Sequence, residues 1–215
     1  MSPVRDESPT LAMLRMCHLA KRIAENKNQP GRLRIVAGNW RSRLLEIADV
    51  PGLRPTSARI RETVFNWLAP RIAGSRCLDL FAGTGALGLE ALSRGAAGCV
   101  FVEKSAKAIQ TLRANISTLQ AENAVVHATG ALKFLQQGGQ APFEIVFLDP
   151  PFAADLLPDV CRLLEESSML ADNARIYIEE DRSQPELKLP ERWQILKTKT
   201  SGNVRYSLLN AGSRT

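Results

Sequence analysis

From residue 76 to residue 180, short apolar segments alternate with longer segments whose apolar residues recur at helical spacing. Apolar runs of this length are typical of strands buried on both faces, and the segments between them are typical of amphipathic helices. This alternation predicts a parallel sheet with helices on both of its faces. The last two strand candidates have no helix between them, so we expect them to form an antiparallel hairpin at one edge. The expected strands lie in RCLDLFAG (76–83), GCVFVE (98–103), NAVVHAT (123–129), FEIVFLDPPF (143–152), ARIYIEE (174–180), WQILKTKT (193–200) and VRYSLLN (204–210).

The first third of the chain differs in charge from the rest and suggests three parts. We expect residues 1–30 to form an N-terminal extension with a helix over 10–26, residues 31–75 a basic hairpin followed by a helix, and residues 76–215 the alternating domain. Residues 1–75 carry 13 Lys and Arg against 6 Asp and Glu, whereas residues 76–215 carry 15 against 16. A one-sided positive excess is typical of proteins that bind a polyanion, although a solubilising tail would have the same composition.

Two elements are expected in the basic part. Residues 32–48 are predicted to form two short strands around a Gly-Asn turn. The helix that follows is expected over residues 57–69, with Ser57 or Thr56 as its N-cap and Pro70 beyond its end.

The cysteines and the hydropathy favour a cytoplasmic protein. No run of 18 apolar residues occurs, so we expect no transmembrane helix and no association with a membrane. Cys17, Cys77, Cys99 and Cys161 are scattered without a close pair, which argues against a zinc site and against a disulfide framework. A reducing compartment is consistent with this pattern.

The loop after the first predicted strand contains Asp79, Gly83 and Gly85 in the pattern Asp-x-x-x-Gly-x-Gly. In an open α/β sheet such a loop lies beside the switch point where ligands bind, and glycines let a ligand approach the backbone. Gly88 completes the dinucleotide spacing Gly-x-Gly-x-x-Gly, which also occurs in structural turns, and no Lys-Ser or Lys-Thr follows as in an ATP-type loop. The second strand ends at Glu103, where a carboxylate can accept hydrogen bonds from both ribose hydroxyls. Together these features predict a ligand that contains adenosine.

The fourth predicted strand ends in Asp149, Pro150, Pro151 and Phe152 at the same edge of the sheet. The prolines stiffen the backbone and have no N–H groups, so carbonyl and carboxylate acceptors face the crevice beside an aromatic ring. This set suits a planar group with an exocyclic amine, on which Phe152 would stack. The alternative interpretation is that the prolines only end the strand and Phe152 packs in the core.

Three stretches carry a resemblance to a known family. The sequence DLFAGTGALGLEAL, the strand-end Glu103 and DPPF resemble class I S-adenosylmethionine (SAM)-dependent amino-methyltransferases. The segment RIVAGNWRSRLLEIADVPGLRPTSARIRETVFNWLAP resembles the hairpin and RPTxxRxRE helix of the bacterial 16S rRNA guanine-N2 methyltransferase family (RsmD-type), and the resemblance covers residues 32–210. It implies a Rossmann-like class I methyltransferase sheet with a small N-terminal hairpin and helix. It also implies methyl transfer from SAM to N2 of guanine 966 in 16S rRNA, on an assembled or assembling small ribosomal subunit; we expect a monomer.

The resemblance gives each part of the site an expected role. Asp149, Pro150, Pro151 and Phe152 would hold the guanine amine. Residues expected to bind SAM are Asp79, Phe81, Ala82, Gly83, Thr84, Gly85, Ala86, Glu103, Lys104, Gly130 and Ala131. Gly130 stands where many relatives have a polar side chain that contacts the adenine amine, so that contact would either be lost here or be made by the backbone. Ala153 and Ala154 stand where basic residues are expected in relatives.

The implied chemistry needs no metal, because a methyl group on a sulfonium is already a strong electrophile. Asp149 would hydrogen-bond the amine, so that its nitrogen becomes more tetrahedral, and would also accept a proton. Neither His18 nor His127 lies in a catalytic motif.

Arginines gather in and beside the predicted hairpin. Arginine has a planar fork that binds phosphate and can stack on unpaired bases. The residues predicted to bind RNA are Arg32, Arg34, Trp40, Arg41, Arg43, Arg54, Arg59 and Arg61. Alternatively, Arg61 braces the cofactor pocket through Glu62 or another acid.

Two other functions stay open. DNA adenine-N6 or cytosine-N4 methyltransferases have a similar motif after the fourth strand, but they usually carry a large target-recognition domain that 215 residues cannot contain. A non-catalytic RNA-binding assembly factor could retain the fold, but the intact Asp79, Glu103 and Asp149 argue against it.

Overall fold

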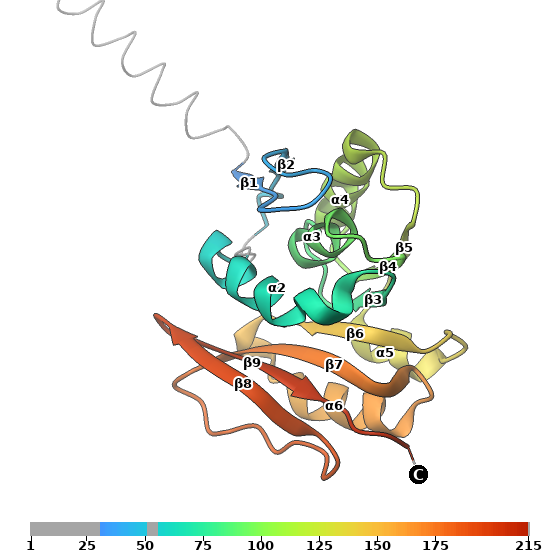
Figure 1. Cartoon of the computed structure of the whole chain (residues 1–215), viewed down its shortest axis with the longest axis vertical. Helices are drawn as coiled ribbons and strands as arrows, with labels where there is room; N and C mark the ends of the chain where they lie inside the picture. The colour runs from blue at the N-terminus through green and yellow to red at the C-terminus, as the bar shows by residue number, and fades with distance from the viewer. Residues whose placement is uncertain (1–30, 51–55, 215) are drawn as a thin grey trace, which may run out of the picture. The chain divides into compact units, whose positions relative to one another are not determined.

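The apolar segments found in the sequence form one seven-stranded sheet (Figure 1). The computed structural model describes residues 31–50 and 56–214. The strands of the sheet are β3 (Arg76–Asp79), β4 (Gly98–Glu103), β5 (Ala124–Ala128), β6 (Phe143–Leu148), β7 (Leu170–Asp181), β8 (Gln194–Ser201) and β9 (Val204–Asn210). Their order across the sheet is β5-β4-β3-β6-β7-β9-β8. The pairs from β5 to β7 are parallel, and β9 is antiparallel to both β7 and β8. The predicted parallel sheet with an antiparallel edge hairpin is therefore confirmed.

Helices cover both faces of the sheet, and each face has its own apolar core. The helices are α2 (Ala58–Ile72), α3 (Ala86–Ser93), α4 (Ala106–Leu119), α5 (Ala131–Gln137) and α6 (Leu157–Glu166), with a short 3₁₀ turn, η1 (Phe152–Ala154). One cluster joins α2, α3 and α4 to inward side chains such as Cys77 and Phe101, and the other joins α5 and α6 to Leu78 and Val102. Adjacent residues of a strand thus point to opposite faces of the sheet. Burying an apolar side chain completely, as at Phe101, stabilises the fold by roughly 1.5–3 kcal/mol.

The basic hairpin is present, but its strands are shorter than the sequence suggested. β1 (Arg32–Arg34) pairs antiparallel with β2 (Leu44–Glu46). The connection is a longer loop rather than a two-residue Gly-Asn turn, with a hydrogen bond from Arg41 N to Gly38 O of 3.1 Å. Its backbone is held by α3: Asn39 N donates to Ser93 O over 2.7 Å. The loop follows the surface of α3 instead of turning back at once.

Helix α2 begins as predicted but ends later. Ser57 is the N-cap, and its side chain accepts a hydrogen bond from Ile60 N over 3.3 Å. Pro70 was expected beyond the end, yet the helix continues to Ile72. Proline removes one hydrogen bond from the last turn, but Ile72 is buried in the core, and this packing keeps the chain helical.

Some predictions lie outside the described residues, namely the helix over residues 10–26 and Arg54. The division of the chain at residues 30 and 75 stays a prediction. Among residues 31–50 and 56–214, no helix has the length and hydropathy needed to cross a membrane.

Candidate active site

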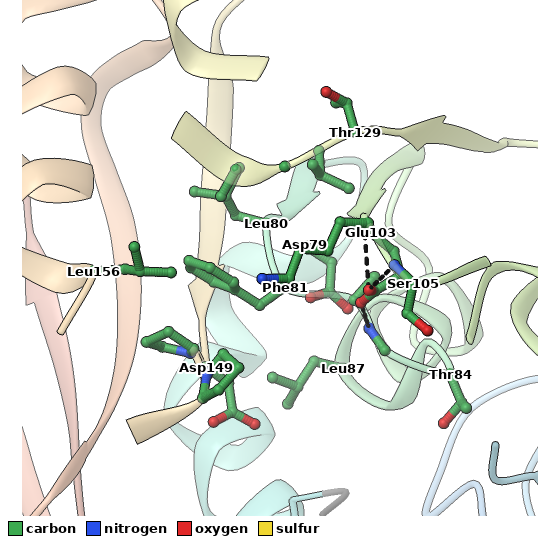
Figure 2. Close-up of a pocket in the computed structure, with 18 of the residues that line it drawn as sticks. Asp79, Leu80, Phe81, Thr84, Leu87, Glu103, Ser105, Thr129, Asp149 and Leu156 are labelled. Carbon is green, nitrogen blue, oxygen red and sulfur yellow. Dashed lines mark hydrogen bonds between the residues drawn. The ribbon is translucent and has the colours of Figure 1, made fainter. Parts of the chain in front are cut away.

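The topology creates one switch point, at β3. The chain goes from β3 to β4 and β5 on one side, and then returns to β6 on the other side of β3. The connections from β3 and β6 therefore diverge at the carboxyl ends of these strands, which is where open α/β sheets bind ligands. A cavity of about 580 Å³ lies there. Figure 2 shows carboxylates from the ends of β3, β4 and β6 around it: Asp79, Glu103 and Asp149.

The cavity brings together nearly all residues that the sequence singled out. Asp149 to Phe152 line it, and so do all the predicted SAM-binding residues except Gly85. Lining residues that sequence reasoning missed are Val50, Thr56, Leu80, Leu87, Val102, Ser105, Thr129, Leu132, Lys133 and Leu156. Four of them lie within a strand or helix and the other six in the connecting loops. Two had a sequence signal: Thr56 lies within the quoted RPTxxRxRE segment, and Ser105 stands at the N-cap position of α4.

The glycine loop has a conformation that explains its sequence. Gly85 is the N-cap of α3 with a φ of +89°, and a Cβ there would lie 2.6 Å from Leu112 Cδ1. Gly88 packs so closely on the sheet that a Cβ would lie 2.2 Å from the Phe101 ring. Its N–H donates to Asp79 Oδ2 over 2.9 Å. Gly85 therefore shapes the loop and the start of α3 instead of lining the cavity, and Gly88 lets the helix approach the strand.

Asp79 lies at the base of the cavity and is almost completely buried. Its pKa is raised to about 7, mainly by burial and also by the nearby Glu103, while the hydrogen bond from Gly88 offsets part of this rise. A cationic group bound beside Asp79 would favour its ionised form, so ligand charge and the protonation of Asp79 are linked.

Glu103 is held by the backbone around it. Its Oε1 accepts from Lys104 N over 2.8 Å and from Ser105 N over 2.7 Å, and its Oε2 accepts from Gly83 N over 2.8 Å (Figure 2, dashed lines). These bonds tie the end of β4 to the glycine loop and to the start of α4. A carboxylate has about four acceptor positions, so it can still accept from a ligand hydroxyl. Gly130, at the start of α5, has nothing within 4 Å of the place of a Cβ, so its backbone faces open space.

Asp149 joins a group of buried polar side chains behind the cavity. Thr56 Oγ1 lies 3.1 Å from Asp149 Oδ2 and 2.8 Å from Glu179 Oε1, and Tyr177 Oη donates to Glu179 Oε1 over 2.7 Å. Burial raises the pKa of Asp149 well above its usual range, the neighbouring Glu179 raises it further, and the Thr56 hydrogen bond lowers it. Burial also raises the pKa of Glu179, while hydrogen bonds from Tyr177 and Thr56 lower it. Sequence reasoning missed Glu179, which had no signal beyond its place in a strand.

Phe152 is not a core residue. Its side chain is 40 % exposed, and it begins the 3₁₀ turn that follows the two prolines. The interpretation of this motif as a strand stop with Phe152 packed inside is therefore wrong, and the ring is available at the rim of the cavity.

The basic residues divide into two groups. The first group is exposed and comprises Arg32, Arg34, Arg41, Arg43 and Arg59. Trp40, which lies among them in the sequence, is half-buried against the core.

Arg61 differs from this group, because its side chain is completely buried. Its guanidinium donates to Thr56 O over 3.2 Å, to Glu90 Oε2 over 3.3 Å and to Arg34 O over 2.8 Å. A buried, paired guanidinium cannot reach RNA, so its inclusion among the RNA-binding residues is corrected. Arg61 instead braces the fold, through Glu90 and not through the exposed Glu62.

Comparisons with known proteins agree with this geometry. The family model described as "Conserved hypothetical protein 95" matches residues 33–210. Ribosomal RNA small subunit methyltransferase D of Escherichia coli K12 is 48 % identical over 183 residues, which cover 85 % of this chain and 92 % of the relative. The protein of the same name from Haemophilus influenzae is 46 % identical over 187 residues, covering 86 % and 96 %. The solved structure of the putative methyltransferase yhhF from Escherichia coli has a TM-score of 0.80 at 43 % identity and covers 86 % of this chain and 100 % of that one. The chain therefore belongs to the Conserved hypothetical protein 95 family, the RsmD-type family that includes the ribosomal RNA small subunit methyltransferase D proteins.

Proposed function

We propose that this protein transfers a methyl group from SAM to the exocyclic N2 of one guanine in 16S rRNA, guanine 966, on the small ribosomal subunit. It would act as a monomer in the cytoplasm. The observation that carries the proposal is the cavity at the switch point, which is lined both by Glu103 and the glycine loop, the residues expected to hold SAM, and by Asp149 to Phe152, the residues expected to hold the guanine. The similarity to proteins named ribosomal RNA small subunit methyltransferase D supports an rRNA substrate.

The residues present fit SAM as the cofactor. A volume of about 580 Å³ is within the usual range for small-ligand sites. Glu103 is placed to accept from ribose hydroxyls, and the buried Asp79 gives the glycine loop a negative group that suits the cationic end of SAM. When bound, SAM supplies a methyl group on a sulfonium, which a neutral nitrogen can attack without a metal.

Asp149, the Pro150 carbonyl and Phe152 would receive the guanine. Asp149 is partly exposed to the cavity and can accept a hydrogen from the amine, while Phe152 at the rim stacks on the base. Hydrogen bonds to the amine reduce the delocalisation of its lone pair and align the nitrogen for attack. The base must leave its stack, which costs a few kcal/mol, and stacking on Phe152 offsets part of that cost.

Glu103→Ala should weaken SAM binding without changing RNA binding. The variant removes the charge-assisted hydrogen bond that the remaining acceptor position of Glu103 can make to ribose, worth at most about 1.5–3 kcal/mol. It also frees the amides of Gly83 and Ser105, which water can then reach. Calorimetry with SAM measures the effect, and binding of small subunits is the control. An unchanged SAM affinity would show that Glu103 does not hold the ribose.

The exposed arginines of the hairpin should bind the rRNA next to the target. Reversing the charge of Arg41 and Arg43 together should leave folding and SAM binding unchanged and abolish binding and methylation of small subunits. Each arginine that contacts phosphate should contribute about 0.7–0.9 to the slope of log affinity against log salt. The matched control reverses Lys197 and Lys199, which are exposed on the edge strand β8 and change the net charge equally. Wild-type affinity and an unchanged salt slope in the arginine variant would show that the hairpin only covers the fold.

Transfer of a labelled methyl group tests the proposed function against its alternatives. Labelled SAM is incubated with the protein and one of three substrates: small subunits from a strain that lacks the enzyme, naked 16S rRNA, or duplex DNA. We expect label in the rRNA of the subunits and none in DNA. Label in DNA would indicate a DNA methyltransferase, and SAM binding without transfer would indicate an assembly factor.

A further inference from the structure

Thr56 connects two acidic side chains, one at the cavity and one behind it. Its Oγ1 lies 3.1 Å from Asp149 Oδ2 and 2.8 Å from Glu179 Oε1. Thr56, Glu179 and Tyr177 are buried, and Asp149 is partly exposed. Asp149 and Thr56 line the cavity, whereas Glu179 lies behind them on β7. Asp149, Thr56 and Glu179 therefore form a hydrogen-bonded path from the cavity into the core.

The number of protons on this path determines its charge. A threonine hydroxyl has one proton, so Thr56 can donate to only one carboxyl group at a time. If both carboxyls were ionised, one of them would face the lone pairs of the Thr56 oxygen in the protein interior, which is strongly unfavourable. One of the two must therefore be protonated and donate to Thr56.

The surrounding donors indicate which carboxyl is ionised. Glu179 can accept from both Tyr177 and Thr56, whereas among the described residues Asp149 has only Thr56 as a donor. An ionised carboxylate is stabilised by each hydrogen bond that it accepts. A neutral Asp149 beside an ionised Glu179 thus satisfies the hydrogen bonds best. Burial raises the pKa of both carboxyls, that of Asp149 well above its usual range; hydrogen bonds from Tyr177 and Thr56 oppose the rise at Glu179, whereas only the Thr56 hydrogen bond opposes it at Asp149.

We propose that Glu179 is the final acceptor of the proton that leaves the guanine amine, and that Asp149 and Thr56 pass this proton on. The proposal rests on the proposed function, since it requires an amine at Asp149. As the nitrogen forms a bond to the methyl group, the bond between that methyl group and the sulfur of SAM would break and leave a neutral thioether; one N–H bond of the nitrogen then breaks and the proton goes to Asp149 Oδ1. Asp149 Oδ2 gives its own proton to Thr56 Oγ1, and Thr56 gives its hydroxyl proton to Glu179 Oε1. Asp149 and Thr56 end as they began, Glu179 becomes neutral, and the nitrogen loses its positive charge.

Other charged and titratable groups around this path are Asp79 on β3, Tyr206 on β9 and Arg61 on α2. Arg61 Nε donates to the main-chain oxygen of Thr56 over 3.2 Å and so fixes the residue that joins the two carboxyls. Asp79 adds negative charge near Asp149 and therefore disfavours an ionised Asp149 further. In this scheme Asp149 is the catalytic residue, and Thr56 and Glu179 act through it.

The first test uses the full-length wild-type protein without SAM or RNA. The side-chain carboxyl carbons of Asp and Glu are labelled with carbon-13 and followed by NMR as the pH changes, with Asp149→Asn and Glu179→Gln used for assignment. We expect a neutral Asp149 and a charged Glu179 at neutral pH, and titrations that depend on each other. Thr56→Ser should keep this dependence, and Thr56→Val should weaken it to the part that comes from repulsion between the two charges. Two ionised carboxylates at neutral pH in the wild-type protein would overturn the proposal, whether or not any variant folds.

The second test compares Glu179→Gln with Glu180→Gln. The glutamine side chain can accept the same hydrogen bonds as Glu179 but cannot take up a proton, so kcat should fall by at least about 10²-fold while KM for small subunits and SAM affinity stay unchanged. The acid limb of the pH profile of kcat should move to higher pH. In this variant the negative charge must lie on Asp149, which accepts fewer hydrogen bonds than Glu179 does and therefore loses its proton at higher pH. Glu180 is the next residue and pairs with Arg205, so its variant should keep the wild-type kcat and pH profile.

An unchanged kcat and acid limb in Glu179→Gln would contradict the proton path. If instead the wild-type protein transfers no methyl group, the proposed function fails, and the carboxyl titration still decides whether the pair shares a proton.

Discussion

Asp149→Ala is expected to lower the rate of methyl transfer by at least about 10²-fold while SAM affinity stays at the wild-type value. The variant removes the acceptor that faces the amine and also breaks the contact with Thr56, so the proton has no path to Glu179. Single-turnover rates with labelled SAM measure the effect, and calorimetry measures SAM binding.

Asp149→Asn separates the two roles of this residue. Asparagine keeps an acceptor for the amine and cannot relay a proton, so we expect it to bind small subunits normally and to react slowly. Near-normal turnover of Asp149→Ala would contradict any role of this side chain in the reaction, and fast turnover of Asp149→Asn would show that proton transfer is secondary.

Glu90→Ala should be the most destabilising of the substitutions considered. The Glu90 carboxylate is completely buried and accepts from Val36 N and Ala37 N over 2.8 and 3.0 Å. It also pairs with Arg61 over 3.3 Å and with Arg94 over 2.7 Å. Removing one partner of a buried ion pair usually costs about 3–5 kcal/mol, because the other charge is left without a partner. That is a large part of the roughly 5–15 kcal/mol by which a domain is stable.

The free energy of unfolding in urea, followed by circular dichroism, tests this prediction. Glu62→Ala is the matched control, since it removes the same charge from an exposed position next to Arg61. The control should keep the wild-type stability. Equal stability of both variants would contradict the view that Glu90 holds the hairpin loop to α3, and an equal loss in both would point to net charge instead.

The parallel part of the sheet could be predicted from the sequence because its strands are local apolar runs that alternate with helical segments. Ser105 illustrates this, since it caps α4 as its sequence position suggests, with a 3.4 Å hydrogen bond from Ala108 N. Much of the cavity lining was also predictable, because Asp79 and Glu103 end strands and Gly83 lies in the loop that directly follows β3. A residue that ends a strand of a parallel sheet lies at the carboxyl edge of that sheet, and this can be predicted without knowing any contact between distant segments.

The residues that were not predicted depend on contacts between distant segments. Thr56 and Glu179 are 123 residues apart, and nothing in either local sequence indicates that they meet. Arg61 looked like its exposed neighbour Arg59, and only the fold shows that one faces the core and the other solvent. Pro70 shows the same limit, because tertiary burial of Ile72 overrides a local helix-ending signal.

The central claim is methylation of N2 on a single guanine of 16S rRNA, and a map of the modified base tests it most directly. Small subunits from a strain that lacks the enzyme are incubated with the protein and labelled SAM, and the rRNA is then digested and sequenced by mass spectrometry. We expect one labelled nucleotide, N2-methylguanosine at position 966, and much less label there when Asp149→Ala replaces the wild-type protein. Label on another base, on another atom of guanine, or spread over many positions would contradict it.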